Sequence, residues 1–184
     1  FFRLTPDGDP FLDQAAVVSD KNGLRLTWNR PVGAQGSSLA LGLDYFRDDS
    51  AQVLTRSGRE WVPETRFETL APFVQGTWAA SDAVTVVAGL RHEDAELKVD
   101  DFTTIAAANS TFVRGGAPDF SETLPNAGVI WRFAEYWNVY GSFSEGFTMP
   151  DAGRVLRGIN VPGLDVDSLL TVEPIVTDNR EIGL

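Results

Sequence analysis

Residues 127–147 read AGVIWRFAEYWNVYGSFSEGF, and this stretch decides the fold. Apolar side chains occupy every second position across 127–133 and again across 137–143, and residues 134–136 separate the two runs. A two-residue period places alternate side chains on opposite faces of a strand, whereas a helix repeats every 3.6 residues. The stretch therefore predicts two antiparallel strands joined by a tight turn.

The same alternation recurs along the chain, for example where Leu24, Leu26 and Trp28 alternate with polar residues. We predict strands at 22–30, 37–48, 67–79, 83–99, 121–134, 137–147 and 174–184. No amphipathic helical pattern of convincing length competes with these segments. The predicted fold class is all-β, an antiparallel up-and-down meander of about seven strands.

The connections between these strands alternate between short and long. Short ones lie at 31–36, 80–82 and 134–136, and long ones at 49–66, 100–120 and 148–172. Successive connections of a meander emerge at opposite ends of the sheet, so every tight turn is expected at one end. Long loops are uncommon in compact soluble domains, whereas transmembrane β-barrels combine short turns on one side with long loops on the other. The pattern predicts part of a transmembrane β-barrel.

Aromatic side chains gather near the short turns, at Trp28, Trp78, Trp131, Phe133 and Trp137. Tryptophan has an apolar body and a polar N–H, which suits it to the boundary between lipid tails and headgroups. We expect a second aromatic girdle near the opposite strand ends, made of Tyr45, Phe73, Phe143 and Phe147. Small and aliphatic side chains fill the outward positions between the girdles, as a hydrocarbon-facing band requires.

Composition excludes several classes of function. Fifteen Lys and Arg against 26 Asp and Glu give a net charge of −11, which argues against a nucleic-acid partner. The absence of Cys and the presence of a single His exclude thiol nucleophiles, Cys-ligated zinc and a Ser-His-Asp relay. We expect no enzyme, no cofactor and no metal site. Apolar runs never exceed four residues, so we also expect no transmembrane helix.

The ends of the sequence indicate a piece of a longer protein. It opens with Phe1-Phe2-Arg3, with no leader segment, and stops at Leu184 inside a predicted strand. We expect residues 1–184 to be a single partial barrel domain, truncated at both ends.

Three blocks resemble the β-barrel of TonB-dependent outer-membrane receptors. They are LPNAGVIW at 124–131, WNVYGSFSEGFTMP at 137–150, and VEP at 172–174 followed by NREIGL at 179–184. In that family, a P-x-x-G-h-x-W/Y strand precedes V-Y-G-S-F-S-x-G-F-x-x-P, a long loop and h-x-P-E … E-I-G. Here Glu173 and Pro174 stand in swapped order. Similarity is clearest over 120–184, and 1–66 carry no motif of their own.

The resemblance implies a barrel of about 22 strands in the outer membrane, plugged by an N-terminal globular domain. Such receptors take up a ferric siderophore, cobalamin, haem or another scarce solute, using energy relayed by TonB through that plug. The implied partners are outer-membrane lipid and lipopolysaccharide, the solute, and TonB. No plug is found in this sequence, so the chain represents about seven strands of the wall.

Two other functions remain open. A passive porin-like outer-membrane channel has the same kind of barrel, with a lipid-facing exterior and a polar interior, but no plug. A soluble carbohydrate-binding β-sandwich would use the alternating apolar face as its core instead of exposing it to lipid.

Solute selection is assigned to the long loops, where Arg154 and Arg157 are candidate ligand-facing residues. Many ferric siderophore complexes are anionic, and arginine offers charge with forked hydrogen bonding. The alternative is that these arginines pair with lipopolysaccharide phosphates or with the loop acids Asp151 and Asp165.

Other charged residues have less specific roles. His92 is expected to be a hydrogen-bonded lumen or loop residue. The acids at 93–101 are interpreted as a solvated loop stem rather than a Ca²⁺ site, because a calcium loop's spacing is absent. Lumen-facing Arg25, Arg91 and Arg132 are predicted to contact the plug or line the pathway.

Overall fold

The computed structural model describes residues 2–4, 8–33, 36–105, 108–149, 151–169 and 174–184. Its main sheet contains seven long strands: β3 (Ala15–Pro31), β4 (Ser38–Leu54), β5 (Glu60–Ala79), β6 (Val84–Val99), β9 (Asp119–Ala134), β10 (Trp137–Thr148) and β11 (Ile175–Gly183). Two small pairs accompany it, β1 (Phe2–Leu4) with β2 (Pro10–Leu12) and β7 (Phe102–Thr103) with β8 (Phe112–Val113). In the chain, helices α1 (Ala152–Leu156) and α2 (Val166–Leu169) follow β10 and precede β11.

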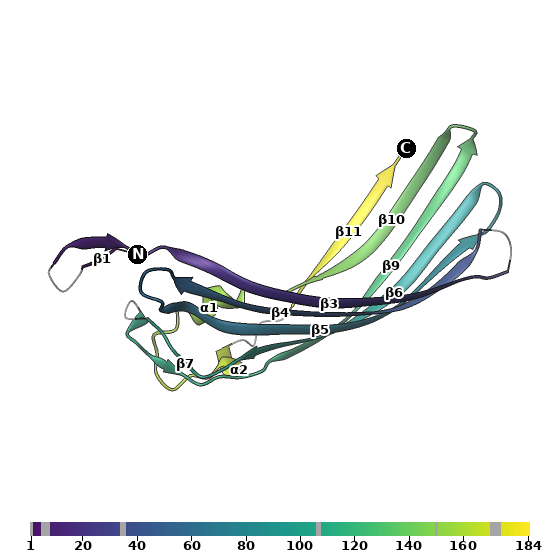
Figure 1. Cartoon of the computed structure of the whole chain (residues 1–184). Coiled ribbons are helices and arrows are strands. Elements are labelled where there is room, and N and C mark those ends of the chain that lie inside the picture. The colour runs from purple at the N-terminus through teal and green to yellow at the C-terminus, as the bar shows by residue number, and fades with distance from the viewer. Residues whose placement is uncertain (1, 5–7, 34–35, 106–107, 150, 170–173) are drawn as a thin grey trace.

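The main sheet is an antiparallel meander in the order β3-β4-β5-β6-β9-β10-β11, and β3 and β11 are its open edges. All seven predicted strands are present, so the predicted fold class is confirmed. Figure 1 shows the tight connections together at one end of the curved sheet, with β7, α1 and α2 at the other. This is the asymmetry that the connection lengths predicted.

The prediction of a long loop at 49–66 was wrong. β4 continues to Leu54 and β5 begins at Glu60, so the connection spans only 55–59. The strands remain paired here, although Gln52 and Val53 mark irregularities in the register. The apolar alternation stops because charged residues such as Asp49, Glu64 and Arg66 enter the sequence here, yet the strand pairing continues.

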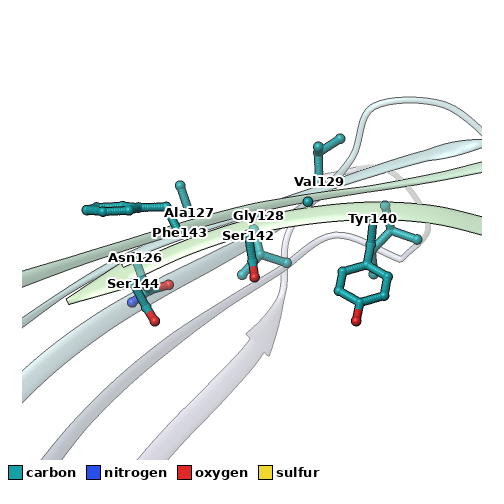
Figure 2. Close-up of a pocket in the computed structure, with 11 residues that line it drawn as sticks. Asn126, Ala127, Gly128, Val129, Tyr140, Ser142, Phe143 and Ser144 are labelled. Atoms are coloured by element: carbon teal, nitrogen blue, oxygen red, sulfur yellow. The ribbon is translucent and has the colours of Figure 1, made fainter. Parts of the chain in front are cut away.

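The two faces of the sheet differ as the two-residue period requires. Cross-strand register places Leu26, Leu43, Val74, Leu90 and Val129 on one face, and Arg25, Asp44 and Arg91 on the other. Figure 2 shows this alternation on β9 and β10, where Ala127, Val129 and Phe143 project to one side while Asn126, Tyr140, Ser142 and Ser144 project to the opposite side. We call these the outer and inner faces.

The outer face is an uncovered apolar band. Leu26, Val74 and Val129 keep 54%, 37% and 44% of their surface exposed. Within the described residues, the remaining sheets are two-stranded and no second sheet covers this band. Along β5, the band runs from Leu70 to Trp78, about 26 Å of strand, or about 20 Å of height at a barrel-like tilt. An uncovered band of this height fits lipid and contradicts the sandwich alternative.

Beyond the band, toward the long loops, the outer face becomes charged. Arg47 Nε and Arg66 Nε each lie 2.7 Å from a carboxylate oxygen of Asp49. The register places these residues on the same face as Tyr45. Along β4, Arg47 and Asp49 are the next two outward-facing residues after Tyr45 toward the long loops, and Arg66 pairs with Asp49. Such a cluster requires water or headgroups, so it marks where hydrocarbon ends.

The aromatic girdles follow the prediction with one correction. Four tryptophans lie at the tight-turn end and are exposed: Trp28, Trp78, Trp131 and Trp137. Tyr45, Phe143 and Phe147 lie on the outer face, but Phe73 pairs with Gly42 and Arg91 on the inner face. Residue 73 is one position from outward Val74, so its parity excludes it from the girdle.

Buried apolar residues gather at the long-loop end, on the inner side of the wall. Their core contains Leu97, Val99, Val113, Leu156, Ile159 and Val166. In the part of the chain that the structure describes, no helix is long and apolar enough to cross a membrane.

Candidate functional site

The inner face carries a charged network across β3, β4 and β6. Arg25 donates from Nε and Nη2 to the two carboxylate oxygens of Asp44, at 2.8 and 3.1 Å. Arg91 donates from Nη1 to Asp44 Oδ2 at 2.6 Å, and its Nε donates to Glu93. Thr69 Oγ1 completes the network by donating to Glu93 Oε2 at 3.0 Å. Because two cations face two anions, the network is neutral and attracts no anionic solute by net charge.

The members of this network differ in how deeply their side chains are buried. The Asp44 side chain is 12% exposed, whereas that of Arg25 is 76% exposed and faces the lumen. The Arg91 guanidinium carbon lies 5.9 Å from the Phe73 ring centroid, and that ring occupies the space where a Cβ on Gly42 would lie. The lumen-facing placement predicted for Arg25 and Arg91 is therefore observed, with Asp44 and Glu93 as partners.

Residues 151–169 of the third long loop fold back against the inner face instead of projecting away. We call residues 112–116 and 151–169 the inner ledge. Apolar side chains of the ledge pack on inner-face residues of the wall, including Phe67, Leu97, Val99 and Phe120. Helix α1 also contacts β5, where Gly153 lies against Val62.

Short helices of the ledge are capped by its acids. Asp151 Oδ1 accepts the Arg154 backbone N–H at 3.0 Å, and Asp165 Oδ1 accepts the Ser168 backbone N–H at 2.8 Å. Hydrogen bonding by the Ser168 hydroxyl and backbone N–H holds the pKa of Asp165 below its ordinary value. Both carboxylates serve as helix caps.

The candidate residues Arg154 and Arg157 lie on α1 and directly after it. Arg157 stacks its guanidinium over the Trp61 ring, 4.8 Å from the centroid, and Arg154 is exposed. Among the described residues, neither side chain forms a salt bridge within 4.0 Å, and Asp151 and Asp165 bind backbone N–H groups instead. The ledge therefore presents one cation stacked on an indole ring, Arg157, and a second, exposed cation three residues earlier in the chain, Arg154. Trp61 was not predicted as a site residue, because it fell in the segment interpreted as a loop.

The structure disperses the remaining candidates. His92 lies on the outer face, where Nδ1 is 2.9 Å from Thr123 Oγ1, so it is hydrogen-bonded but not in the lumen. Of the acids at 93–101, Glu93 lies on the inner face, Asp94 and Glu96 lie on the outer face, and Asp101 accepts the Gly115 backbone N–H. Within the described residues, no three His, Cys, Asp or Glu side chains gather to hold a metal. Arg132 Nη1 donates to the Asp82 carbonyl near a tight turn.

An antiparallel meander with an uncovered apolar exterior, tryptophans at the tight-turn end and a charged inner face defines part of the wall of a transmembrane β-barrel. The chain belongs to the TonB dependent receptor-like β-barrel family, whose model matches residues 2–184. It is accordingly an outer-membrane protein, as predicted.

Similar proteins include siderophore receptors. The chain is 27% identical to a ferric aerobactin receptor of Klebsiella pneumoniae, over 90% of its length and 26% of the relative. It is 27% identical to a rhizobactin receptor of Rhizobium meliloti (strain 1021), over 84% of its length and 22% of the relative. Among solved structures, the copper transporter OprC superposes with a TM-score of 0.64 at 16% identity, covering 95% of this chain and 28% of that one. This likeness shows the fold.

The chain thus spans about a quarter of the length of the curated relatives that it matches. These relatives are receptors rather than enzymes, in agreement with the predicted absence of catalysis.

Proposed function

We propose that this chain forms part of the wall of a receptor that takes up a ferric siderophore. The observation that carries the proposal is the similarity to two receptors named for ferric aerobactin and rhizobactin, over 84–90% of the chain. The proposed mechanism is capture of the solute at the long-loop end and release through the lumen.

Chemistry at the ledge supports an anionic solute. Arg154 and Arg157 have no carboxylate partner among the described residues, and a guanidinium binds carboxylate or catecholate oxygens through forked, charge-assisted hydrogen bonds. Both residues belong to the inner ledge, whereas lipopolysaccharide surrounds the outside of a barrel. We therefore favour the solute over lipopolysaccharide phosphates as their partner.

The proposal extends to the remaining partners. The energy for uptake comes from TonB and is relayed through a plug domain of the complete receptor. Outer-membrane lipid covers the apolar band, and lipopolysaccharide covers the charged zone around Arg47, Asp49 and Arg66.

The test is uptake of ⁵⁵Fe-labelled ferric aerobactin by cells that carry the complete receptor as their only siderophore receptor. Replacing both ledge arginines, Arg154→Gln with Arg157→Gln, should raise the concentration of ferric aerobactin that gives half-maximal uptake about ten-fold or more. The reason is that a hydrogen bond to a charged group contributes about 1.5–3 kcal/mol. Arg30→Gln is the matched control, because it removes a positive charge at the tight-turn end. If the double variant and the control reach half-maximal uptake at the same concentration of ferric aerobactin, the role of the ledge arginines is refuted.

The same assay separates a receptor from a porin-like channel. An energy-coupled receptor loses uptake in cells that lack TonB, whereas a passive channel does not. Uptake that is unaffected by the loss of TonB would overturn the proposed function.

A further inference from the structure

The inner ledge is assembled from segments that are distant in sequence, yet its core excludes water. Leu156, Val113 and Val166 are each 0% exposed, although they come from α1, β8 and α2. They pack against Leu97 and Val99 at the end of β6. This degree of burial is unusual in a chain whose wall is otherwise largely exposed, and a loop that only covers an opening does not need it.

Backbone hydrogen bonds join the two long loops into one unit. The Val166 N–H donates to the Arg114 carbonyl at 3.0 Å, and the Arg114 N–H donates to the Leu164 carbonyl at 3.4 Å. The Ala117 N–H donates to Asp167 Oδ1 at 2.9 Å. The second loop is tied in turn to the wall, because Val99 and Gly116 exchange hydrogen bonds in both directions at 2.9 and 3.0 Å.

Two glycines show how closely the ledge packs, one within the ledge and one against the wall. A Cβ on Gly116 would collide with the Asp167 carboxylate, and one on Gly153 would lie 3.2 Å from Val62 Cγ1. Gly153 joins the ledge to β5, and Arg157 over Trp61 adds a second contact to that strand. The ledge is therefore held together across the two loops and is attached to both β5 and β6.

We propose that the inner ledge is a fixed part of the wall, which stays docked while solute binds and passes and which permanently narrows the mouth of the lumen on this side. Undocking would expose Leu156, Val113 and Val166 to water and would break the paired backbone groups of both loops. Movement that admits solute then occurs elsewhere in the receptor. The proposal concerns the ledge itself and does not depend on which solute is carried.

The first test measures the accessibility of the ledge core to a labelling reagent, both without solute and with ferric aerobactin. In the complete receptor in intact cells, Leu156→Cys and Val155→Cys are compared for labelling by a membrane-impermeant maleimide. Val155 is the matched control, because it is the neighbouring apolar residue and is 36% exposed. This 184-residue segment contains no Cys, and the receptor without either substitution gives the background.

A fixed ledge predicts that Leu156→Cys labels at least about ten-fold more slowly than Val155→Cys, with and without ferric aerobactin. Labelling of the two variants at similar rates, in either condition, would overturn the proposal. Since Leu156→Cys also reduces the buried volume, a second measurement leaves this core intact.

The second test locks the ledge to the wall with Val62→Cys and Gly153→Cys, whose close approach suits a disulfide. The fixed ledge predicts that the disulfide forms and that ⁵⁵Fe-aerobactin uptake stays within about two-fold of the reduced form. Uptake that stops on oxidation and returns on reduction would overturn the proposal, as would failure of the cysteines to cross-link in a folded receptor. Absence of uptake in both redox states and in the unmodified receptor would count against ferric aerobactin as the solute. In that case the labelling test would still determine whether the ledge stays docked.

Discussion

A positive charge placed in the middle of the apolar band tests which solvent that face contacts. Val74 lies on β5, four residues from Leu70 and four from Trp78, which mark the two ends of the band on that strand. Four residues of tilted strand correspond to a depth of about 10 Å from either end, so Val74 is close to the bilayer midplane. We expect Val74→Arg to destabilise the barrel by about 2–4 kcal/mol, the cost of a lipid-facing arginine at that depth.

Gln75 provides the matched control, because it is the next residue on the same strand and points to the inner face. There an arginine side chain meets the aqueous lumen, so Gln75→Arg should cost less than about 1 kcal/mol. The assay is urea unfolding of the complete receptor refolded into phospholipid vesicles, followed by tryptophan fluorescence. Equal destabilisation by the two substitutions, or a larger cost at Gln75, would refute the assignment of the outer face to lipid.

Three further predictions concern the inner side of the wall. Leu156→Ala should lower the local stability of the ledge by about 2–5 kcal/mol and accelerate amide hydrogen exchange in α1 but not in β9, so uniform acceleration would contradict a locally held ledge. Asp44→Ala should lower the free energy of unfolding in urea by about 1–3 kcal/mol, and by more than Arg25→Ala does, because it leaves Arg91 without the carboxylate that it shares with Arg25. The reverse order would contradict the network. The pKa of Asp165 is lower in the folded ledge, so its carboxylate stabilises α2 above its ordinary pKa of about 4, and this stabilisation is lost as pH falls through the folded-state value. Exchange of the Ser168 amide, corrected for intrinsic rate, should accelerate in that acidic range in the native chain and not in Asp165→Asn; identical pH profiles would exclude this cap.

Much of the fold was predictable because its main determinant is local. Alternation along each strand assigns every residue to a face, and Trp28, Trp78 and Trp131 mark one end of the sheet without knowledge of the register. The Phe73 error shows that parity carries more information than residue type. An aromatic ring near a strand end suggested a girdle, but its position beside outward Val74 already placed it inside.

The misplaced loop at 49–66 has a different cause. Apolar and polar residues alternate along a strand only where one of its faces contacts lipid and the other contacts water. That difference ends where the wall leaves the membrane. In the extension of β4 and β5, charged Asp49 and Arg66 occupy the outer face while the backbone ladder continues. Sequence alternation therefore measured the height of the lipid band rather than the length of the strands.

The candidate site was the least predictable part. Arg154 and Arg157 were identified from their charge within an apolar loop segment, but Trp61, whose ring Arg157 covers, lies almost a hundred residues earlier in the sequence. The ledge depends on contacts between two long loops and three strands. Such non-local packing leaves no periodic signal, although the apolar residues Leu156 and Val166 in an expected surface loop were an available hint.

The central claim is that one face of these strands contacts lipid and the other contacts an aqueous lumen. Spin labels placed singly along β9 from 125 to 133 in the complete receptor, in lipid bilayers, test it most directly. We predict that labels at odd-numbered positions collide mainly with oxygen dissolved in the bilayer, and labels at even-numbered positions mainly with a water-soluble nickel chelate. Loss of this alternation, or its inversion, would contradict the account.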